Sequence, residues 1–153
     1  MADMMKRVPV AEQEPKVRAK NFEEVCLGYT EKEAMEEAVR CLNCRNPKCV
    51  VGCPVSIQIN EFIHEVKEGN FEKAAEIIAR SSALPAVCGR VCPQETQCEG
   101  VCIRGIKGEP VAIGKLERFV ADWAREHGFQ AAKAGEPNGK KVAVIGAGPA
   151  GLT

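Results

Sequence analysis

Eight of the nine cysteines lie in two short runs, and their spacing constrains the fold more than any other feature of the sequence. The first run is Cys41-x2-Cys44-x4-Cys49-x3-Cys53, followed by Pro54, and the second is Cys88-x3-Cys92-Pro93-x4-Cys98-x3-Cys102. Four thiolates on short loops are the usual ligands of a four-iron cluster. The two runs therefore predict a framework for metal clusters.

The composition supports a small domain stabilised by such a framework. The chain has 153 residues, and only 5% are aromatic, so an inorganic cross-link would compensate for a modest aliphatic core. Lys plus Arg and Asp plus Glu number 21 each, which leaves no basic field for nucleic acid. Without a leader or a long apolar run we expect a cytoplasmic protein with no membrane contact, where thiols bind metals rather than form disulfides.

Two helices are predicted on either side of the cysteine runs. Thr30 and Glu33 form a capping box, which predicts a helix from Glu31. Its apolar face should run into the first cysteines through Ala34, Met35, Ala38, Val39 and Leu42. A second apolar stripe predicts a helix over residues 111–127, closed by Gly128.

A helical hairpin is predicted as the spacer between the runs. Apolar residues recur at helical spacing over 57–67 and again over 71–81. Gly69 should end the first helix, and Asn70 should cap the second. We therefore predict a mainly α fold, with the cysteine-binding domain over residues 29–128.

The sequence patterns at the two ends of the chain differ from that of this domain. The sequence of residues 1–28 predicts an extended arm that requires a partner surface. Within this arm we interpret Cys26 as a free, partly buried thiol. Residues 129–140 have the composition of a linker.

Residues 141–153 resemble the start of a dinucleotide-binding domain. A buried strand over 141–145 is expected to lead into Gly146, Gly148 and Gly151, the glycine fingerprint of an FAD site. One strand and one turn cannot hold a dinucleotide. We therefore expect a fragment of a longer protein, cut at the start of its flavin domain.

The Cys-Pro pairs suggest how the ligands are shared. In bacterial ferredoxins the cysteine before proline binds the other cluster. By this analogy Cys53 crosses to the second cluster and Cys102 crosses back to the first. The predicted sets are Cys41, Cys44, Cys49 and Cys102 for one cluster, and Cys53, Cys92, Cys98 and Cys88 for the other.

Other interpretations remain at this point. Two all-cysteine zinc sites could staple a structural interaction domain, although zinc motifs usually pair Cys-x2-Cys units. Disulfides would require an oxidising compartment. His64 has no second ligand at a metal-like spacing, so we interpret it as a solvated or core-edge histidine.

Several stretches together resemble one family. These are Glu37-Ala-Val-Arg40-Cys41-Leu-Asn-Cys44, the pairs Cys53-Pro54 and Cys92-Pro93, and the closing Val-Ile-Gly-Ala-Gly-Pro-Ala-Gly-Leu. They resemble the N-terminus of the glutamate synthase small subunit family, whose module is also found in dihydropyrimidine dehydrogenase and in NADH-dependent ferredoxin:NADP oxidoreductase. The resemblance implies an α-helical ferredoxin-like domain with two 4Fe-4S clusters, placed ahead of an FAD domain and an NAD(P)H domain.

The resemblance also implies a path for electrons. They would pass from NADPH through FAD to the clusters, and then to a large catalytic subunit that forms glutamate or, in the alternative, to ferredoxin. The module alone would catalyse nothing. In some relatives a Glu or Gln on the helix after the last cysteine is the fourth ligand of the second cluster, so Glu117 is an alternative to Cys88.

Overall fold

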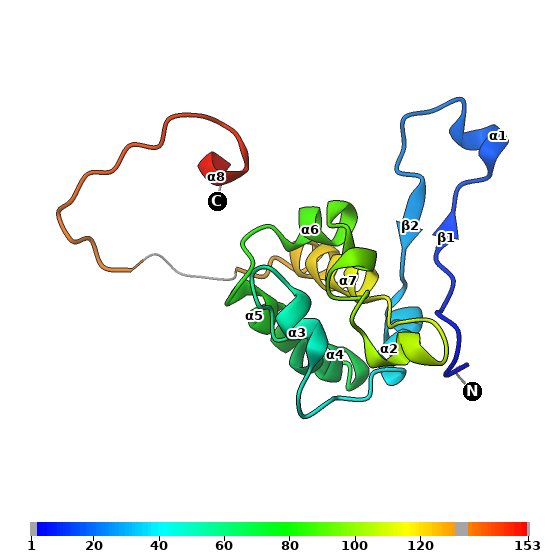
Figure 1. Ribbon diagram of the computed structural model, residues 1–153. Helices are drawn as coiled ribbons and strands as arrows, with labels where there is room; N and C mark the ends of the chain where they lie inside the picture. The colour runs from blue at the N-terminus through cyan, green and yellow to red at the C-terminus, as the bar shows by residue number, and fades with distance from the viewer. Residues whose placement is uncertain (1–2, 131–134, 153) are drawn as a thin grey trace.

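The computed structural model describes residues 3–130 and 135–152, and most of the regular structure in these ranges is helical (Figure 1). The mainly α prediction is confirmed. The helices are α1 (Pro15–Arg18), α2 (Glu31–Val39), α3 (Lys48–Gly52), α4 (Ile59–Lys67), α5 (Phe71–Ala79), α6 (Pro85–Val91), α7 (Ile113–Glu126) and α8 (Pro149–Leu152). Two 3-10 turns follow, η1 (Gln94–Thr96) between Cys92 and Cys98 and η2 (Ile103–Ile106) directly after Cys102.

Helix α2 begins with the predicted capping box. The Thr30 hydroxyl accepts a hydrogen bond from the Glu33 amide, and the Glu33 carboxylate accepts one of 2.8 Å from the Thr30 amide. The predicted apolar face is wrong in its second half, because the helix ends at Val39 and both Val39 and Leu42 are exposed. The buried face carries Glu37 instead.

Helices α4 and α5 form the predicted hairpin. Gly69 has a φ of +79°, and the Asn70 amide donates to the Glu65 carbonyl at 2.9 Å, which closes α4 in a Schellman motif. The Asn70 side chain does not cap α5 as predicted. It donates to the Glu65 carboxylate at 3.0 Å, which ties the turn to α4 instead.

The hydrophobic core lies between this hairpin, α2 and α7. Phe71 and Phe119 pack edge to face with ring centroids 5.1 Å apart, and aliphatic residues supply most of the remaining core. Helix α7 ends at Glu126 and Gly128 follows with a φ of +68°, as predicted. The core includes Ile59, Phe62, Ile63, Val66, Ile78, Val111, Ile113, Leu116 and Val120.

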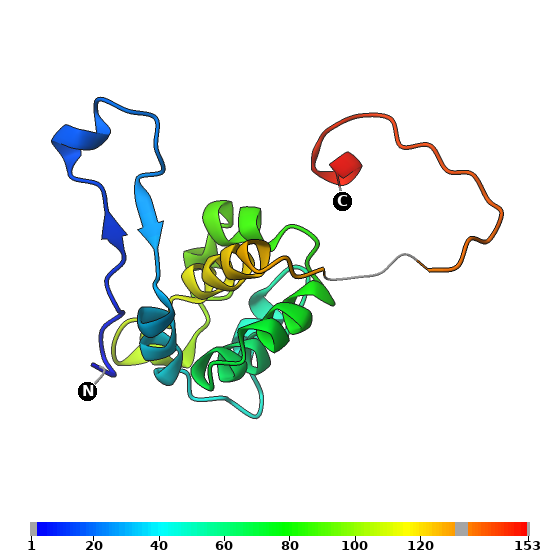
Figure 2. The same ribbon diagram turned by 180° about the vertical axis from the view of Figure 1, so that it is seen from behind.

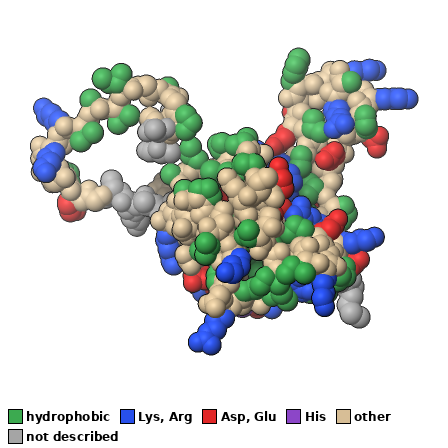
Figure 3. Space-filling model, in the orientation of Figure 1, with side chains coloured by type: hydrophobic (Ala, Val, Ile, Leu, Met, Phe, Trp, Pro, Cys, Tyr) green, Lys and Arg blue, Asp and Glu red, His purple; other side chains and the backbone are tan. Residues whose placement is uncertain are grey.

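The N-terminal arm is a ribbon that projects from the helical body in both views (Figures 1 and 2). Strands β1 (Ala11–Glu12) and β2 (Cys26–Gly28) pair antiparallel, and α1 forms its tip. The arm also contacts its own domain, since Glu24 accepts from Arg90 of α6 at 2.7 Å and pairs with Arg118 of α7 at 3.1 Å. Lysine and arginine side chains lie at the tip (Figure 3).

The C-terminal segment, residues 135–152, extends away from the helical body (Figures 1 and 2). The buried strand predicted over 141–145 is absent from this described segment, where Val142 and Ile145 are 86% and 98% exposed. A strand without a neighbouring strand has no ladder to join. The glycine turn is present, with a φ of +119° at Gly146, and α8 follows it. Part of the predicted linker, residues 131–134, lies outside the described residues.

Across the described ranges, no helix has the length and apolar character needed to cross a membrane.

Candidate metal-cluster site

Four cysteines from both runs line one pocket. Cys41 and Cys44 come from the loop after α2, Cys49 from α3, and Cys102 from the turn before η2. The structure thus brings together the four residues predicted for the first cluster, and their role as ligands stays a prediction. The remaining wall is largely apolar and includes Leu42, Ile59, Ile63, Val101, Ile103, Val111 and Ile113.

Burial dominates the chemistry of these thiols. It raises the pKa of Cys41 and raises the pKa of Cys49 to about 11, and the nearby thiols Cys102, Cys44 and Cys41 add to these shifts. Without a bound cation Cys41 and Cys49 hold their protons at neutral pH. A positively charged cluster would displace the protons on binding, as thiolate ligands of metals require.

The remaining cysteines of the two runs lie near one another, with Cys88 in α6 and Cys92 directly after it. Burial raises the pKa of Cys92 to about 11, with further contributions from Cys88, Glu117 and Cys53. It also raises the pKa of Cys98 to about 12, again with Cys53 and Glu117 nearby. Cys53 of the first run therefore lies near Cys92 and Cys98 of the second run, and its role as a ligand stays a prediction.

Glu117 faces this second group from α7. Its side chain is buried, and burial raises the pKa of its carboxyl group to about 7. One carboxylate oxygen, Oε1, is buried without a hydrogen-bond partner among the described residues. A buried carboxylate oxygen with no partner is costly unless something else binds it. This orphan oxygen fits a metal ligand, so Glu117 and Cys88 are both placed to complete the second set.

Close packing of α6 against α7 fixes Glu117 relative to the thiols. Gly89 of α6 is buried, and a Cβ atom at this position would lie 2.6 Å from the Arg118 backbone nitrogen. Only a glycine permits this approach. Gln94 adds to the contact by donating to the Cys88 carbonyl at 3.2 Å.

The described side chains do not converge on one point. In the described part of the chain, no three Cys, His, Asp or Glu side chains are grouped so as to hold one metal ion. Zinc would require its sulfur ligands to converge on one point, each about 2.3 Å away. The cysteines of the first site instead line a shared pocket.

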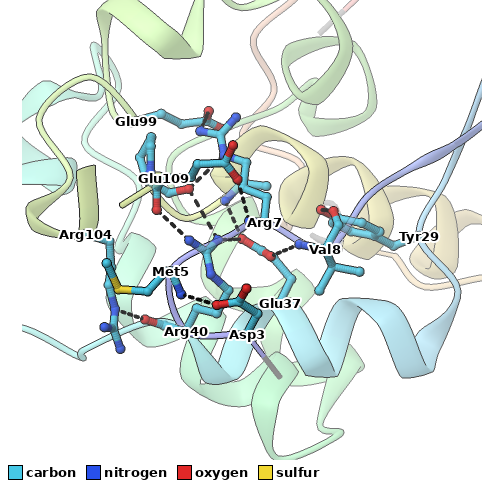
Figure 4. A network of polar contacts seen from close by, with 12 residues as sticks. Asp3, Met5, Arg7, Val8, Tyr29, Glu37, Arg40, Glu99, Arg104 and Glu109 are labelled. Atoms are coloured by element: carbon cyan, nitrogen blue, oxygen red, sulfur yellow. Dashed lines mark hydrogen bonds and ion pairs between the residues drawn. The ribbon is translucent and has the colours of Figure 1, made fainter. Parts of the chain in front are cut away.

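A buried charge network lies beside the first pocket (Figure 4). Glu37 of α2 and Arg40, which follows its last residue, are fully buried and pair at 2.5 Å. Glu37 also accepts hydrogen bonds from the Val8 amide at 2.7 Å and the Ala112 amide at 2.8 Å. One carboxylate therefore joins the N-terminal segment, α2 and the chain before α7.

Further arginines extend this network. Arg7 donates to the Pro110 carbonyl at 2.7 Å and pairs with Glu99 at 2.5 Å, and Glu99 accepts from the Gly114 amide at 3.0 Å. Arg104 donates to the Arg40 carbonyl at 2.7 Å. These contacts fix Glu99 to the N-terminal segment and Arg104 to Arg40, on either side of Cys102.

Sequence reasoning missed these structural roles, although a signal existed. Glu37 occupies a position between Ala34 and Ala38 on the buried face of α2, and Arg40 follows at i+3. A charged pair on an otherwise apolar stripe indicates a buried ion pair.

The other two singled-out residues agree with their interpretations. Cys26 is a free, partly buried thiol, and Lys115 Nζ lies 3.6 Å from its sulfur. His64 lies on the exposed side of α4.

Comparison with known proteins places the chain among iron-sulfur proteins. Residues 18–129 match the family described as dihydropyrimidine dehydrogenase domain II, 4Fe-4S cluster. The chain is 42% identical to the glutamate synthase [NADPH] small chain of Escherichia coli over 149 residues, which is 97% of this chain and 32% of that protein.

Two further Escherichia coli proteins are similar. The NAD-dependent dihydropyrimidine dehydrogenase subunit PreT is 42% identical over 131 residues, 86% of this chain and 32% of the relative. The putative oxidoreductase UacF is 41% identical over 137 residues, 88% of this chain and 21% of the relative. The chain therefore spans about a third or less of the length of these relatives.

Proposed function

The chain belongs to the family of dihydropyrimidine dehydrogenase domain II, 4Fe-4S cluster, and from this we propose that it transfers electrons through two four-iron clusters. The observation that carries the proposal is the division of the eight cysteines between two groups. Each group takes three cysteines from one run and one from the other. Two adjacent clusters would allow an electron to pass from one to the other.

The proposed ligands of the first cluster are Cys41, Cys44, Cys49 and Cys102. They line one pocket whose apolar wall would exclude water from the cluster. Exclusion of water and the hydrogen bonds to sulfur are among the levers that set a cluster's reduction potential.

The proposed ligands of the second cluster are Cys53, Cys92 and Cys98, completed by Glu117 or Cys88. The unpartnered Oε1 of Glu117 favours the carboxylate, because ligation would satisfy a buried acceptor. Cys88 lies beside Cys92, where it could serve as the ligand instead.

When bound, each four-iron cluster would supply a site that accepts and releases one electron. The protein chain would hold the clusters in position. The buried pair of Glu37 and Arg40 holds α2 against the loop before α7, and Gly89 lets α6 approach α7 closely. These contacts keep the two cysteine groups adjacent without any group on the chain undergoing chemistry.

We propose that the parent enzyme is of the glutamate synthase type. The match to the glutamate synthase small chain covers 97% of the chain and reaches further than the match to PreT, at 86%. In this proposal an FAD domain, begun by Gly146, Gly148 and Gly151, delivers electrons from NADPH, and a large catalytic subunit receives them. A ferredoxin receives them in the alternative parent, an NADH-dependent ferredoxin:NADP oxidoreductase.

The deciding experiment measures iron, zinc and acid-labile sulfide in anaerobically prepared protein, together with its visible spectrum. We expect about eight irons and eight sulfides per chain and a brown colour that dithionite bleaches. About two zincs without sulfide would support a zinc-stapled interaction domain instead. About four irons would reduce the proposal to a single cluster.

A further inference from the structure

The two cysteine groups differ in the charges around them. The residues that line the first pocket include two cations, Lys48 and Arg104, and no carboxylate. Two carboxylates lie near the second group, Glu99 at Cys98 and Glu117 at both Cys92 and Cys98. The sites are therefore not electrostatically equivalent, although both are built from cysteines.

Arg104 is fixed in place. Its Nε donates to the Arg40 carbonyl at 2.7 Å, one residue before Cys41, and its side chain is partly buried. Arg40 in turn is fully buried and donates to the Glu109 carbonyl at 2.5 Å. A guanidinium stays charged at every accessible pH. The pocket thus holds a permanent positive charge beside Cys41.

Within the described residues, the cations near the second site are paired with carboxylates, and Arg7 pairs with Glu99 at 2.5 Å. The arginines of the flanking helices, Arg90 and Arg118, are paired with Glu24 and Asp122. Glu117, whether ionised or protonated, supplies no positive charge.

Reduction of a cluster adds one negative charge, so a nearby cation favours the reduced form and a nearby carboxylate disfavours it. We infer that Arg104 makes a cluster at the first site easier to reduce than one at the second. An electron that enters the module therefore settles at the first site. This inference rests on the proposed function, because it requires two clusters.

The electron transfer involved is simple. With both clusters bound, one electron would pass from the second site to the first, so that each site would change by one charge while no bond forms and no proton moves. In the experiment below dithionite supplies the electron.

The test is a potentiometric titration of the loaded protein, with the reduced clusters followed by electron paramagnetic resonance. Cys44→Ser first identifies which signal belongs to the first site. In the unsubstituted protein we expect that signal to appear at the higher potential. We expect Arg104→Gln to shift its reduction equilibrium about tenfold toward the oxidised form, which is 59 mV for one electron.

Matched variants separate charge from structure. Arg104→Lys keeps the positive charge and should restore most of the potential. Lys107→Gln removes a positive charge from an exposed residue of the same loop that does not line the pocket, and should leave both potentials unchanged.

An unchanged first-site potential in Arg104→Gln, with about eight irons still bound, would overturn the inference while the two-cluster function stands. Equal shifts at both sites would overturn it too. If Arg104→Gln loses iron, the test passes to Lys48→Gln, which must lower the same potential, though by less because water screens the exposed Lys48 side chain. Iron well below eight in the unsubstituted protein would instead refute the proposed function.

Discussion

Cys102 lines the same pocket as Cys41, although one belongs to the second cysteine run and the other to the first. Cys53 makes the opposite exchange and lies near Cys92 and Cys98. The helical hairpin of α4 and α5 connects the first cysteine run to the second.

The exchange predicts which cluster each serine substitution removes. Cys53→Ser should perturb the cluster of Cys92 and Cys98, and Cys102→Ser the cluster of Cys41. Each variant should retain about four irons, because the other site keeps its ligands. Mössbauer and paramagnetic resonance spectra should show different surviving clusters. If both variants lost the same cluster, the crossed ligand sets would be wrong.

The fourth ligand of the second site can be tested directly. Because Glu117 has an unpartnered buried oxygen, we expect Glu117→Ala to lose iron from the second site and Cys88→Ser to retain it. Iron analysis of anaerobic samples measures both. The reverse result would assign the ligand to Cys88.

Breaking the buried ion pair should cost stability. Glu37→Gln leaves the Arg40 guanidinium buried without its counter-ion, and loss of one partner of such a pair costs about 3–5 kcal/mol. Urea unfolding of the loaded protein gives the change in the free energy of unfolding. Glu36→Gln is the matched control, since Glu36 forms no side-chain hydrogen bond or ion pair within the described residues, and a comparable loss there would contradict the prediction.

Gly89→Ala should force α6 away from α7. The added Cβ would lie 2.6 Å from the Arg118 nitrogen, and overpacking of this kind costs about 1–3 kcal/mol. Cys88 and Cys92 would move relative to Glu117, so the iron at the second site should fall more than the iron at the first.

Gly105→Ala provides the comparison for Gly89→Ala. There the nearest atom to a new Cβ is a Pro110 carbon at 3.6 Å, an ordinary contact, and no loss of iron is expected. Equal losses in the two variants would show that the helix contact is not the cause.

Acid should release the arm from the helical body. A hydrogen bond from Arg90 holds the pKa of Glu24 below its ordinary value of 4.5. Ionised Glu24 therefore stabilises the docked arm above pH 4.5, and this contribution is lost as the pH falls through the lowered pKa. Amide hydrogen exchange over residues 11–28, normalised for its intrinsic pH dependence, should show protection decreasing in that range.

The pH response of the arm should depend on one side chain. Glu24→Gln should remove it, whereas the neighbouring Glu23→Gln should keep it, because Glu23 forms no side-chain contact with Arg90 or Arg118. A response that survives in Glu24→Gln would point to another acid.

Local signals in the sequence predicted the local structure well. The capping box of Thr30, the end of α4 at Gly69 and the end of α7 at Gly128 depend on hydrogen bonds or dihedral angles within a few residues. The start of α6 carried a further signal, Pro85 at the first helical position, which could have been recognised.

Features that depend on distant residues were not predictable in the same way. Asn70 bonds Glu65 rather than capping α5, and Glu37 is buried because amides from residues far along the chain approach it. Residues 141–145 have the composition of a strand, but their conformation depends on neighbouring strands that the described structure does not contain.

The placement of Cys102 beside Cys41 has a consequence for biosynthesis. A chain emerging from the ribosome presents the first three cysteines of this pocket long before the fourth. If Cys102 is the fourth ligand, as proposed, insertion of a complete cluster at the first site waits until the hairpin and the second run have been made, so that the cofactor matures only on a nearly finished domain.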